Sequence, residues 1–272
     1  MDSLLHKVEE LLRHVAEQEI LSRFQNLKET DIFLKDNYGD VVTSADLEAE
    51  NRIREGLLKL LPGSLVIGEE AAHKTPSLMD KLNGRAPVWV ADPVDGTRNF
   101  SKGKACFAVI CALVIDGQTE MGWILDPIAG ACVVARKDCG AYINGQKLTQ
   151  SFIPPNLTAM TGSFDGSLKK RLLAESDLNR PERFVRYHCV GREYMDLALG
   201  KLHFAQYGGK MMPWDHAAGV LIMNETGRYV RTIKGKRPYS PRFRGASESL
   251  LISSNEDSFD ALVTLINRGT AL

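Results

Sequence analysis

In the stretch Val90-Ala91-Asp92-Pro93-Val94-Asp95-Gly96-Thr97-Arg98-Asn99-Phe100, an apolar strand runs into two carboxylates that stand three residues apart. Hard cations such as Mg²⁺ prefer carboxylate oxygens and keep water and phosphate oxygens in their remaining positions. Gly96 allows the backbone to approach a ligand closely, and a helix that begins here offers free N–H groups to a phosphate. The stretch therefore predicts a metal and phosphate site at one turn. A plain tight turn is the alternative, because Asp-Pro and Asp-Gly pairs are common in loops.

The composition is that of an ordinary globular protein. The chain has 272 residues, of which 44% are hydrophobic and 25% are charged, and the length predicts about two domains. Basic and acidic residues both number 34, so the chain has no global field to attract nucleic acid or an acidic membrane. The longest clean apolar run, Phe107 to Ile115, is too short to cross a bilayer.

The cysteines and the first residues predict a cytoplasmic protein. The segment from Met1 to Glu10 mixes charges and has no apolar core of a secretory signal. The cysteines form an odd set without a C-x-x-C pair, and several lie in apolar runs, which favours reduced thiols. These cysteines are Cys106, Cys111, Cys132, Cys139 and Cys189.

In the first half of the chain, helices are expected to pack on an antiparallel sheet. Apolar residues at helical spacing predict a helix from residue 4 to about Leu27, and a second helix is expected to begin near Thr43 and to end at Pro62. A short strand at 65–67 leads to Glu69 and Glu70, followed by a polar loop over 73–85 that we expect to be mobile. A meander of strands is expected over 105–115, 119–125, 131–136 and 140–143.

The second half predicts alternating strands and helices. Strands are expected over 157–162, 184–189 and 203–207, and helices over 192–200, 214–226 and 255–268. This change of rhythm places a domain boundary near residue 150, with an N-terminal α+β portion at 1–150 and a C-terminal α/β portion at 151–272.

Three short motifs resemble the signature of the inositol monophosphatase family, which consists of lithium-sensitive, Mg²⁺-dependent phosphatases. They are Gly68-Glu69-Glu70, Asp92-Pro93-Val94-Asp95-Gly96-Thr97 and Trp214-Asp215-His216-Ala217-Ala218-Gly219, in the family's order and spacing. A lone Asp-x-x-Asp is weak evidence, but three pieces in register are specific. The resemblance covers nearly the whole chain, and it implies a layered α-β-α-β-α sandwich and a homodimer.

The resemblance also implies a set of metal ligands. Glu69, Asp92 and the Val94 carbonyl would hold a first Mg²⁺, Asp92 with Asp95 and Asp215 a second, and a third, weaker ion would lie near Glu69. Glu70 is expected nearby. On residue chemistry alone, Asp215 is equally well explained as an acid favoured by the dipole of a helix N-terminus.

The resemblance assigns roles in catalysis as well. Thr97 would position the attacking water, and the amides of Gly96 and Thr97 would receive the phosphate. Asp46 would orient Thr97, although the residue pattern alone favours Asp46 as a helix cap. In the two-metal scheme one cation activates water and the other stabilises the leaving oxygen. Because protons compete with Mg²⁺ for clustered carboxylates, activity is expected to fall at low pH.

The residues expected to contact the substrate alcohol depart from the inositol pattern. The stretch that usually contacts the ring is here Gly191-Arg192-Glu193, and Gly208 stands where an acid usually binds inositol hydroxyls. Arg192 or Lys210 is a candidate for binding a second phosphate, and Glu193 for replacing the missing acid. Each is equally well explained as a surface ion-pair residue.

A basic stretch leaves a binding function open. Residues 228–244 hold seven basic and no acidic side chains, whereas the other 255 residues hold 27 basic and 34 acidic ones. The stretch is either an exposed loop or hairpin, or a patch for RNA or an extra phosphate. We expect a Mg²⁺-dependent hydrolase of inositol monophosphate or a similar small polyol or sugar phosphate. The alternatives are a phosphatase of adenosine 3′,5′-bisphosphate or fructose 1,6-bisphosphate, and a regulatory partner of the RNA machinery.

Overall fold

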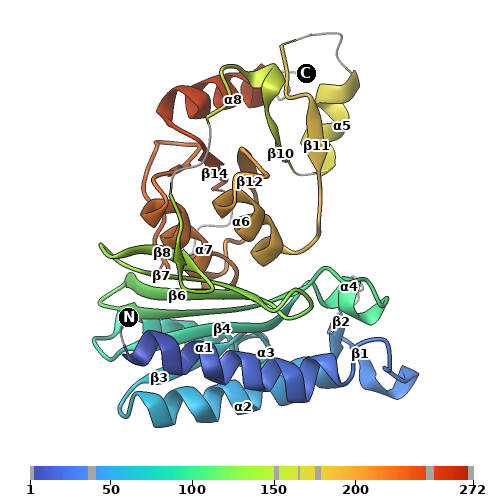
Figure 1. Cartoon of the computed structure of the whole chain (residues 1–272), viewed down its shortest axis with the longest axis vertical. Helices are drawn as coiled ribbons and strands as arrows, with labels where there is room; N and C mark the ends of the chain where they lie inside the picture. Colours follow the sequence, from blue (N-terminus) through green and yellow to red (C-terminus); the bar gives the residue numbers. More distant parts are fainter. Residues whose placement is uncertain are drawn as a thin grey trace.

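The molecule is built of five layers that alternate between helices and sheets (Figure 1). The computed structural model describes residues 3–35, 41–149, 153–164, 166–174, 179–242 and 248–268. Helices α1 (Ser3–Val15) and α2 (Ser44–Leu60) cover one face of a seven-stranded sheet. Helices α6 (Val190–Ala198) and α7 (Pro213–Glu225) lie between this sheet and a five-stranded sheet. Helices α5 and α8 cover the far side. The predicted layered α/β class is confirmed.

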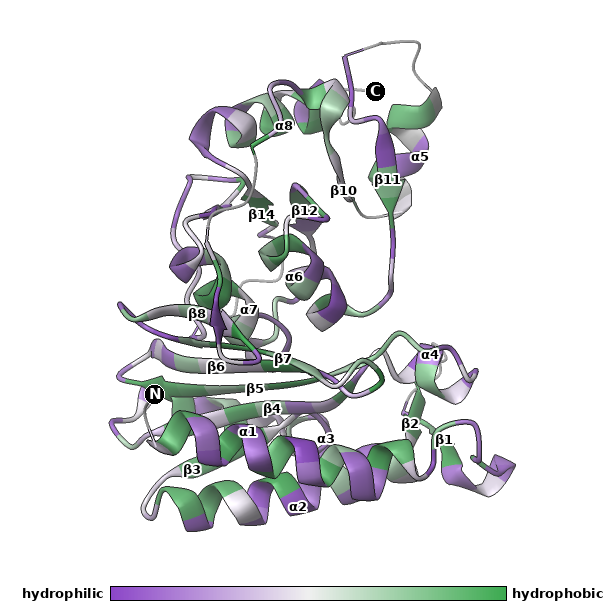
Figure 2. Cartoon of the chain, viewed as in Figure 1, coloured by the Kyte–Doolittle hydropathy of each residue, from purple (hydrophilic) through white to green (hydrophobic). Residues whose placement is uncertain are grey.

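The first layer is held by an apolar helix stripe. Helix α1 (Ser3–Val15) buries Leu5, Val8, Leu12 and Val15, which recur at helical spacing and pack in one cluster with residues of the sheet. Figure 2 shows hydrophobic and hydrophilic residues interspersed along this helix. The chain continues as a π-helix over Ala16–Leu21, so the predicted helix ends before Leu27. Helix α2 (Ser44–Leu60) begins where predicted, and its capping box joins Thr43 and Asp46. Between them, β1 (Ile32–Leu34) and β2 (Val41–Thr43) form an antiparallel pair.

The seven-stranded sheet has the order β3-β4-β5-β6-β7-β8-β9, and only β3 and β4 are parallel. The predicted meander is confirmed, and β9 extends it. The sheet is sandwiched between helices, so every residue of β4 is buried. Its strands are β3 (Leu65–Gly68), β4 (Val88–Asp95), β5 (Ala108–Ile115), β6 (Gln118–Asp126), β7 (Ala131–Arg136), β8 (Gly140–Ile143) and β9 (Gln146–Lys147).

The polar stretch over 73–85, which the sequence predicts to be a mobile loop, is mostly helical. Helix α3 (Glu69–Lys74) begins immediately after β3, and a 3₁₀-helix follows over Pro76–Asn83. Pro76 occupies the first position of that helix, where a missing N–H costs nothing, and Leu82 is buried. Leu78 and Met79 of this helix also pack against the apolar core. The stretch is therefore folded onto the rest of the protein, and its mobility remains a prediction.

Helix α7 (Pro213–Glu225) is the central helix of the middle layer, and ten of its residues are buried. It packs so closely on β6 that a Cβ at Gly122 would lie 2.8 Å from the Cα of Ala218. Helix α6 (Val190–Ala198) lies beside it between the two sheets, and the short helix α4 (Thr97–Ser101) lies at one end of the seven-stranded sheet (Figure 1). Because residues of both chain halves form one apolar cluster in this layer, the first residues of α7 are fixed against the first sheet.

The five-stranded sheet has the order β11-β10-β12-β14-β13 and mixes parallel and antiparallel pairs. Two expected strands are shorter than predicted, because residues 157–159 form a 3₁₀-helix and β11 ends at Val185. The division of the chain at residue 150 remains a prediction. The elements are β10 (Thr161–Ser163), α5 (Gly166–Ala174), β11 (Arg183–Val185), β12 (Phe204–Tyr207), β13 (Tyr229–Thr232), β14 (Leu250–Ser253) and α8 (Glu256–Arg268).

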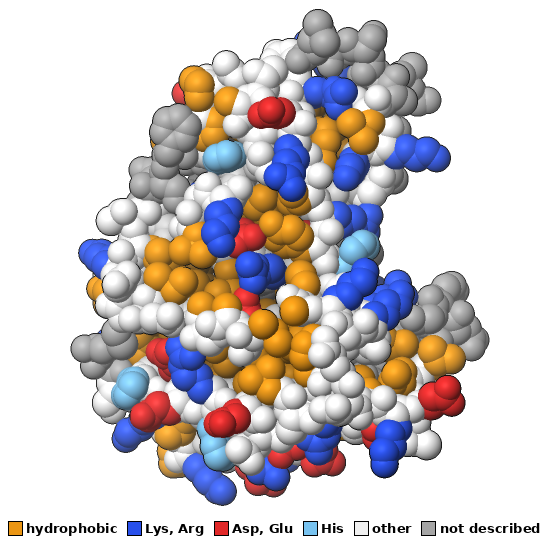
Figure 3. Space-filling model, turned by 45° about the vertical axis from the view of Figure 1, so that its right-hand side comes forward, with side chains coloured by type: hydrophobic (Ala, Val, Ile, Leu, Met, Phe, Trp, Pro, Cys, Tyr) orange, Lys and Arg blue, Asp and Glu red, His pale blue; other side chains and the backbone are white. Residues whose placement is uncertain are grey.

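The described basic residues of the stretch 228–244 differ in their surroundings. Arg228 is buried and donates to the His203 carbonyl, and Arg242 Nε donates to the Leu82 carbonyl at 2.7 Å. Lys236 pairs with Asp260 at 2.6 Å, and Arg237 pairs with Glu248. Phe243 and Arg244 lie outside the described residues. Lys and Arg side chains gather with a His at a hollow on one side of the molecule (Figure 3).

Two further expectations concern the whole chain. All five cysteines are free thiols in the structure. Among the described helices, none combines the length and apolarity that a membrane crossing needs.

Candidate active site

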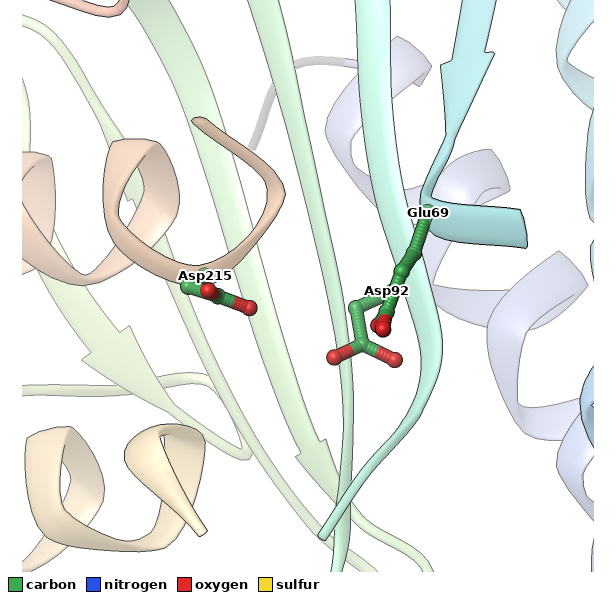
Figure 4. Close-up of side chains that lie close together, drawn as sticks. All are labelled: Glu69, Asp92 and Asp215. Carbon is green, nitrogen blue, oxygen red and sulfur yellow. The ribbon is translucent and has the colours of Figure 1, made fainter. Parts of the chain in front are cut away.

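Three carboxylates from separate elements converge at one point (Figure 4). Glu69 is the first residue of α3, Asp92 lies in β4, and Asp215 lies in the first turn of α7. One oxygen from each lies within 4.8 Å of the other two. Three residues far apart in the sequence, all predicted as ligands, are therefore brought together.

The electrostatics of this cluster fit a bound cation. Burial raises the pKa of Asp92 well above its ordinary value, and the charges of Glu69, Asp95 and Asp215 raise it further. Burial and the Glu69 charge likewise raise the pKa of Asp215. Asp92 is buried and Glu69 and Asp215 are half-buried. Carboxylates this close together are costly without a positive partner, and an all-oxygen donor set suits Mg²⁺. The residues present thus fit a hard divalent ion.

A lysine that the sequence analysis missed lies at the edge of the cluster. Lys35 Nζ is 2.7 Å from Glu69 Oε1 and 2.5 Å from Glu70 Oε1. Burial alone lowers the pKa of Lys35, but the Glu69 charge and the two hydrogen bonds outweigh it and raise the pKa. Burial raises the pKa of Glu70 to about 7. The lysine thus neutralises part of the carboxylate charge, at the position where the resemblance implies the weakest metal ion.

Asp95 is held by the second half of the chain. Its Oδ2 accepts hydrogen bonds from the Gly191 amide at 2.6 Å and from Cys189 Sγ at 3.1 Å. A Cβ at residue 191 would lie 2.8 Å from the Ala108 Cβ, so a glycine is needed for this approach. Asp95 is outside the group of three converging carboxylates. The structure therefore places Gly191 as a support for Asp95, and it is not among the residues lining the cavity.

Thr97 lies between two of the predicted site residues. Its hydroxyl oxygen is 3.0 Å from Asp46 Oδ1 and 3.0 Å from the Val94 carbonyl oxygen. Asp46 Oδ2 accepts from the Thr43 amide at 2.8 Å and from the Thr43 hydroxyl. Asp46 therefore fulfils both of its sequence interpretations, as a helix cap and as a partner of Thr97. Burial raises the pKa of Asp46 to about 6, against the lowering effect of these hydrogen bonds.

The turn between Asp95 and Thr97 requires a glycine. Gly96 has a φ of 94°, and a Cβ there would lie 3.0 Å from the Cys106 carbonyl oxygen. Helix α4 begins at Thr97. The amides of Gly96 and Thr97 thus belong to the start of a helix, where N–H groups lack intrahelical partners.

These residues open into a cavity of about 450 Å³, lined by both halves of the chain. Glu193 is buried in its wall, and its Oε1 accepts from the Ser163 hydroxyl at 3.1 Å and from the Tyr187 amide at 3.3 Å. Burial raises the pKa of Glu193 to about 7. The lining includes the predicted residues Glu69, Asp95, Gly96, Thr97, Glu193, Lys210 and Asp215, and also Lys35, Arg98, Ser163, Arg186, His188, Gln206 and Gly208.

Arg192 does not line this cavity. Its guanidinium pairs with Asp126, and its Nε lies 3.6 Å from Asp196 Oδ1. These two acids hold the side chain on the sheet side of α6. The expectation of a surface ion pair describes Arg192 better than the expectation of a phosphate contact.

Comparison with known proteins gives a consistent result. A sequence profile of the Inositol monophosphatase family matches residues 1–269. An inositol-1-monophosphatase of Mycobacterium leprae is 31% identical over 242 residues, covering 86% of this chain and 80% of the relative. A fructose-1,6-bisphosphatase/inositol-1-monophosphatase of Thermotoga maritima is 26% identical over 235 residues, which cover 86% of this chain and 85% of the relative. Other relatives are named histidinol-phosphatase and Nus factor SuhB.

The fold agrees with these sequence relations. A solved inositol monophosphatase structure from Thermotoga maritima superposes with a TM-score of 0.82 at 24% identity, covering 100% of this chain and 99% of the other. The profile match spans the three motifs that supply the converging carboxylates. The chain belongs to the inositol monophosphatase family.

Proposed function

We propose that this protein is a Mg²⁺-dependent phosphomonoesterase that hydrolyses inositol monophosphate or a similar small polyol or sugar phosphate. The convergence of Glu69, Asp92 and Asp215 carries the proposal, because clustered carboxylates beside an open cavity suit a cation that also binds a phosphate. We assign two or three ions per site, with the Val94 carbonyl and Asp95 completing the ligand set. Lithium sensitivity and a homodimer are part of the same proposal.

The residues around the cations then have defined tasks. When bound, Mg²⁺ lowers the pKa of a coordinated water and stabilises charge on the transferring phosphoryl group. Asp46 accepts a hydrogen bond from the Thr97 hydroxyl, which leaves an oxygen lone pair of Thr97 to accept a hydrogen bond from the attacking water and orient it. The amides of Gly96 and Thr97 donate to the phosphate oxygens. Glu193 and Ser163 face the space left for the leaving alcohol.

The test is phosphate release from inositol 1-phosphate and glycerol 2-phosphate, with Mg²⁺ and with EDTA. The proposal predicts turnover only with Mg²⁺, inhibition by Li⁺, and loss of turnover in Asp95→Asn. If the folded wild-type protein releases no phosphate from any small phosphomonoester in Mg²⁺, the proposal is wrong.

A role in the RNA machinery, as suggested by the relatives named Nus factor SuhB, is the second candidate. In the stretch 228–242, Arg228 donates to the His203 carbonyl, Arg242 to the Leu82 carbonyl, and Lys236 pairs with Asp260, which leaves less charge there for an RNA backbone. Salt-sensitive RNA binding that survives in Asp95→Asn is the result that would favour this candidate.

A further inference from the structure

The mouth of the active-site cavity is positively charged. Arg98, Arg186 and Lys210 line the cavity together with His188, and the same lining contains the carboxylates of Glu69, Asp95 and Asp215. Figure 3 shows Lys and Arg side chains and a His gathered at the hollow between the two parts of the molecule. This arrangement was not visible in the sequence, because these side chains come from separate segments.

The pKa of His188 reflects the positive charges gathered around it. Burial lowers the pKa of His188, and the positive charges of Arg186, Arg98, Lys104 and Lys102 lower it further. Several cations therefore act on one point at the mouth. Such a potential attracts anions and weakens with added salt.

The segment that carries Arg186 is held in place. The Asn99 side-chain amide donates to the Tyr187 carbonyl at 2.9 Å and to the Cys106 carbonyl at 2.9 Å, tying the segment to α4. His188 has a φ of 54°, a conformation that a non-glycine residue rarely adopts and that these contacts maintain. A Cβ at Gly166 would overlap Arg186 Nη1, so the missing side chain leaves room for the guanidinium. These features keep Arg186 at the cavity.

Among the described residues, no acid is paired with Arg186 or with Lys210, whereas Arg192, Lys201 and Lys236 are all paired with acids. Gly208 leaves the wall next to Lys210 without a side chain. An inositol ring, which is uncharged, would leave this potential unused.

We propose that Arg186 and Lys210 bind a second anionic group on the leaving alcohol, so that the site prefers phosphomonoesters carrying a second phosphate or a carboxylate. This inference rests on the proposed function and specifies its substrate class. The cavity of about 450 Å³ has room for a sugar bisphosphate with one phosphate at the carboxylates and the other at the mouth. A guanidinium matches a phosphate or carboxylate bidentately, and an ammonium acts as a point charge.

The test compares kcat/KM for fructose 1,6-bisphosphate, 2-phosphoglycerate and glycerol 2-phosphate, of which only the last lacks a second anion. We expect the wild type to prefer at least one doubly anionic substrate about tenfold or more, corresponding to one charge-assisted contact. Arg186→Gln and Lys210→Gln should each reduce this preference several-fold, mainly through KM. A preference for 2-phosphoglycerate alone would identify a carboxylate, and a preference for the bisphosphate alone would identify a phosphate.

The matched controls are Arg183→Gln, three residues before Arg186, and Lys234→Gln, an exposed lysine in the turn after β13. Neither residue lines the cavity, so both variants should keep the wild-type preference. Equal kcat/KM for all three substrates in the wild type overturns the inference, as does an equal loss for all three in Arg186→Gln.

A binding measurement separates this inference from the proposed function. Calorimetric titration of fructose 1,6-bisphosphate into Asp95→Asn protein, with Mg²⁺ present, reports binding without turnover. Adding Arg186→Gln to that background should weaken binding about fivefold or more. If the wild type shows no hydrolysis but this loss is seen, the proposed function fails and the anion site stands. If hydrolysis is seen and the loss is absent, the anion site fails alone.

Discussion

The Thr97 hydroxyl oxygen lies 3.0 Å from a carboxylate oxygen of Asp46, 51 positions earlier in the chain. The same hydroxyl oxygen lies 3.0 Å from the Val94 carbonyl. A hydroxyl has one proton, so it donates to one of these acceptors at a time. A cation on the Val94 carbonyl would direct the proton to Asp46 and leave a lone pair of Thr97 free for water.

Replacing Thr97 tests this relation. Thr97→Val keeps the shape and removes the hydroxyl, so kcat should fall about 10²- to 10³-fold, in the range of a lost proton-transfer group. Thr97→Ser retains the hydroxyl and should keep most of the activity. The kcat of each variant is measured from initial rates at saturating Mg²⁺. Equal activity in Thr97→Val and Thr97→Ser would contradict the role of the hydroxyl.

The raised pKa of Asp46 predicts that the activity falls at acid pH. Burial raises the pKa of Asp46 to about 6, so Asp46 becomes protonated as the pH falls through 6. A protonated Asp46 is a weaker acceptor for the hydrogen bond from the Thr97 hydroxyl. The kcat at saturating Mg²⁺ should therefore fall below about pH 6. Because the pKa is raised on folding, the contribution of Asp46 to stability is present at low pH and lost as the pH rises from about 4 through 6. If kcat falls below pH 6 in Asp46→Asn as it does in the wild type, the fall has a source other than Asp46.

Lys35 predicts an effect on metal affinity. Its ammonium lies 2.7 Å from a Glu69 oxygen and competes with a cation for the same charge. Lys35→Gln should lower the Mg²⁺ concentration for half-maximal activity several-fold, because one opposing charge at the cluster is removed. Lys28→Gln, which changes an exposed lysine, is the control. An unchanged or higher Mg²⁺ requirement in Lys35→Gln would show that the lysine does not oppose the ion.

His216 predicts a loss of stability in acid. It is fully buried, its Nδ1 lies 3.0 Å from the Tyr194 hydroxyl, and burial lowers its pKa to about 3. The unfolded chain takes up this proton below about pH 6.5 and the folded chain does not, so stability falls as the pH falls from 6.5 toward 3. The loss between pH 6.5 and 4.5 is of the order of 2 kcal/mol.

Urea unfolding in EDTA measures this effect. His216→Gln should be less stable than the wild type at pH 7 but should show a shallower decline toward pH 4.5. His14→Gln, which changes an exposed histidine, should decline as the wild type does. A decline in His216→Gln as steep as that of the wild type would rule out His216 as the source.

Much of the fold and of the metal site could be predicted from the sequence, because local patterns specify both. The stripe of α1, the capping box at Thr43 and the turns of the meander are local signals. The carboxylates of the cluster stand in three short motifs that could be recognised separately. The assignment of each ligand to a particular ion remains a prediction.

The remaining features depend on contacts between distant segments. Nothing near Lys35 in the sequence indicates that it reaches Glu69, 34 positions later. Arg192 stands in the stretch expected to contact substrate, but its guanidinium forms an ion pair with Asp126 at the end of β6. Arg186 lies outside every motif, it lines the cavity, and Asn99 bonds to the carbonyl of the residue that follows it. Such side-chain pairings follow from tertiary packing, which leaves no periodic signal in the sequence.

The most direct test of the account is phosphate release from inositol 1-phosphate by the wild type and by Asp92→Asn, each with Mg²⁺ and with EDTA. Asp92 is buried and contributes an oxygen to the group of converging carboxylates. The account predicts Mg²⁺-dependent release by the wild type and a loss of about 10³-fold or more in the folded variant, because metal stabilisation amounts to several kcal/mol. Release by the wild type in EDTA, or undiminished release by Asp92→Asn, would contradict the metal site.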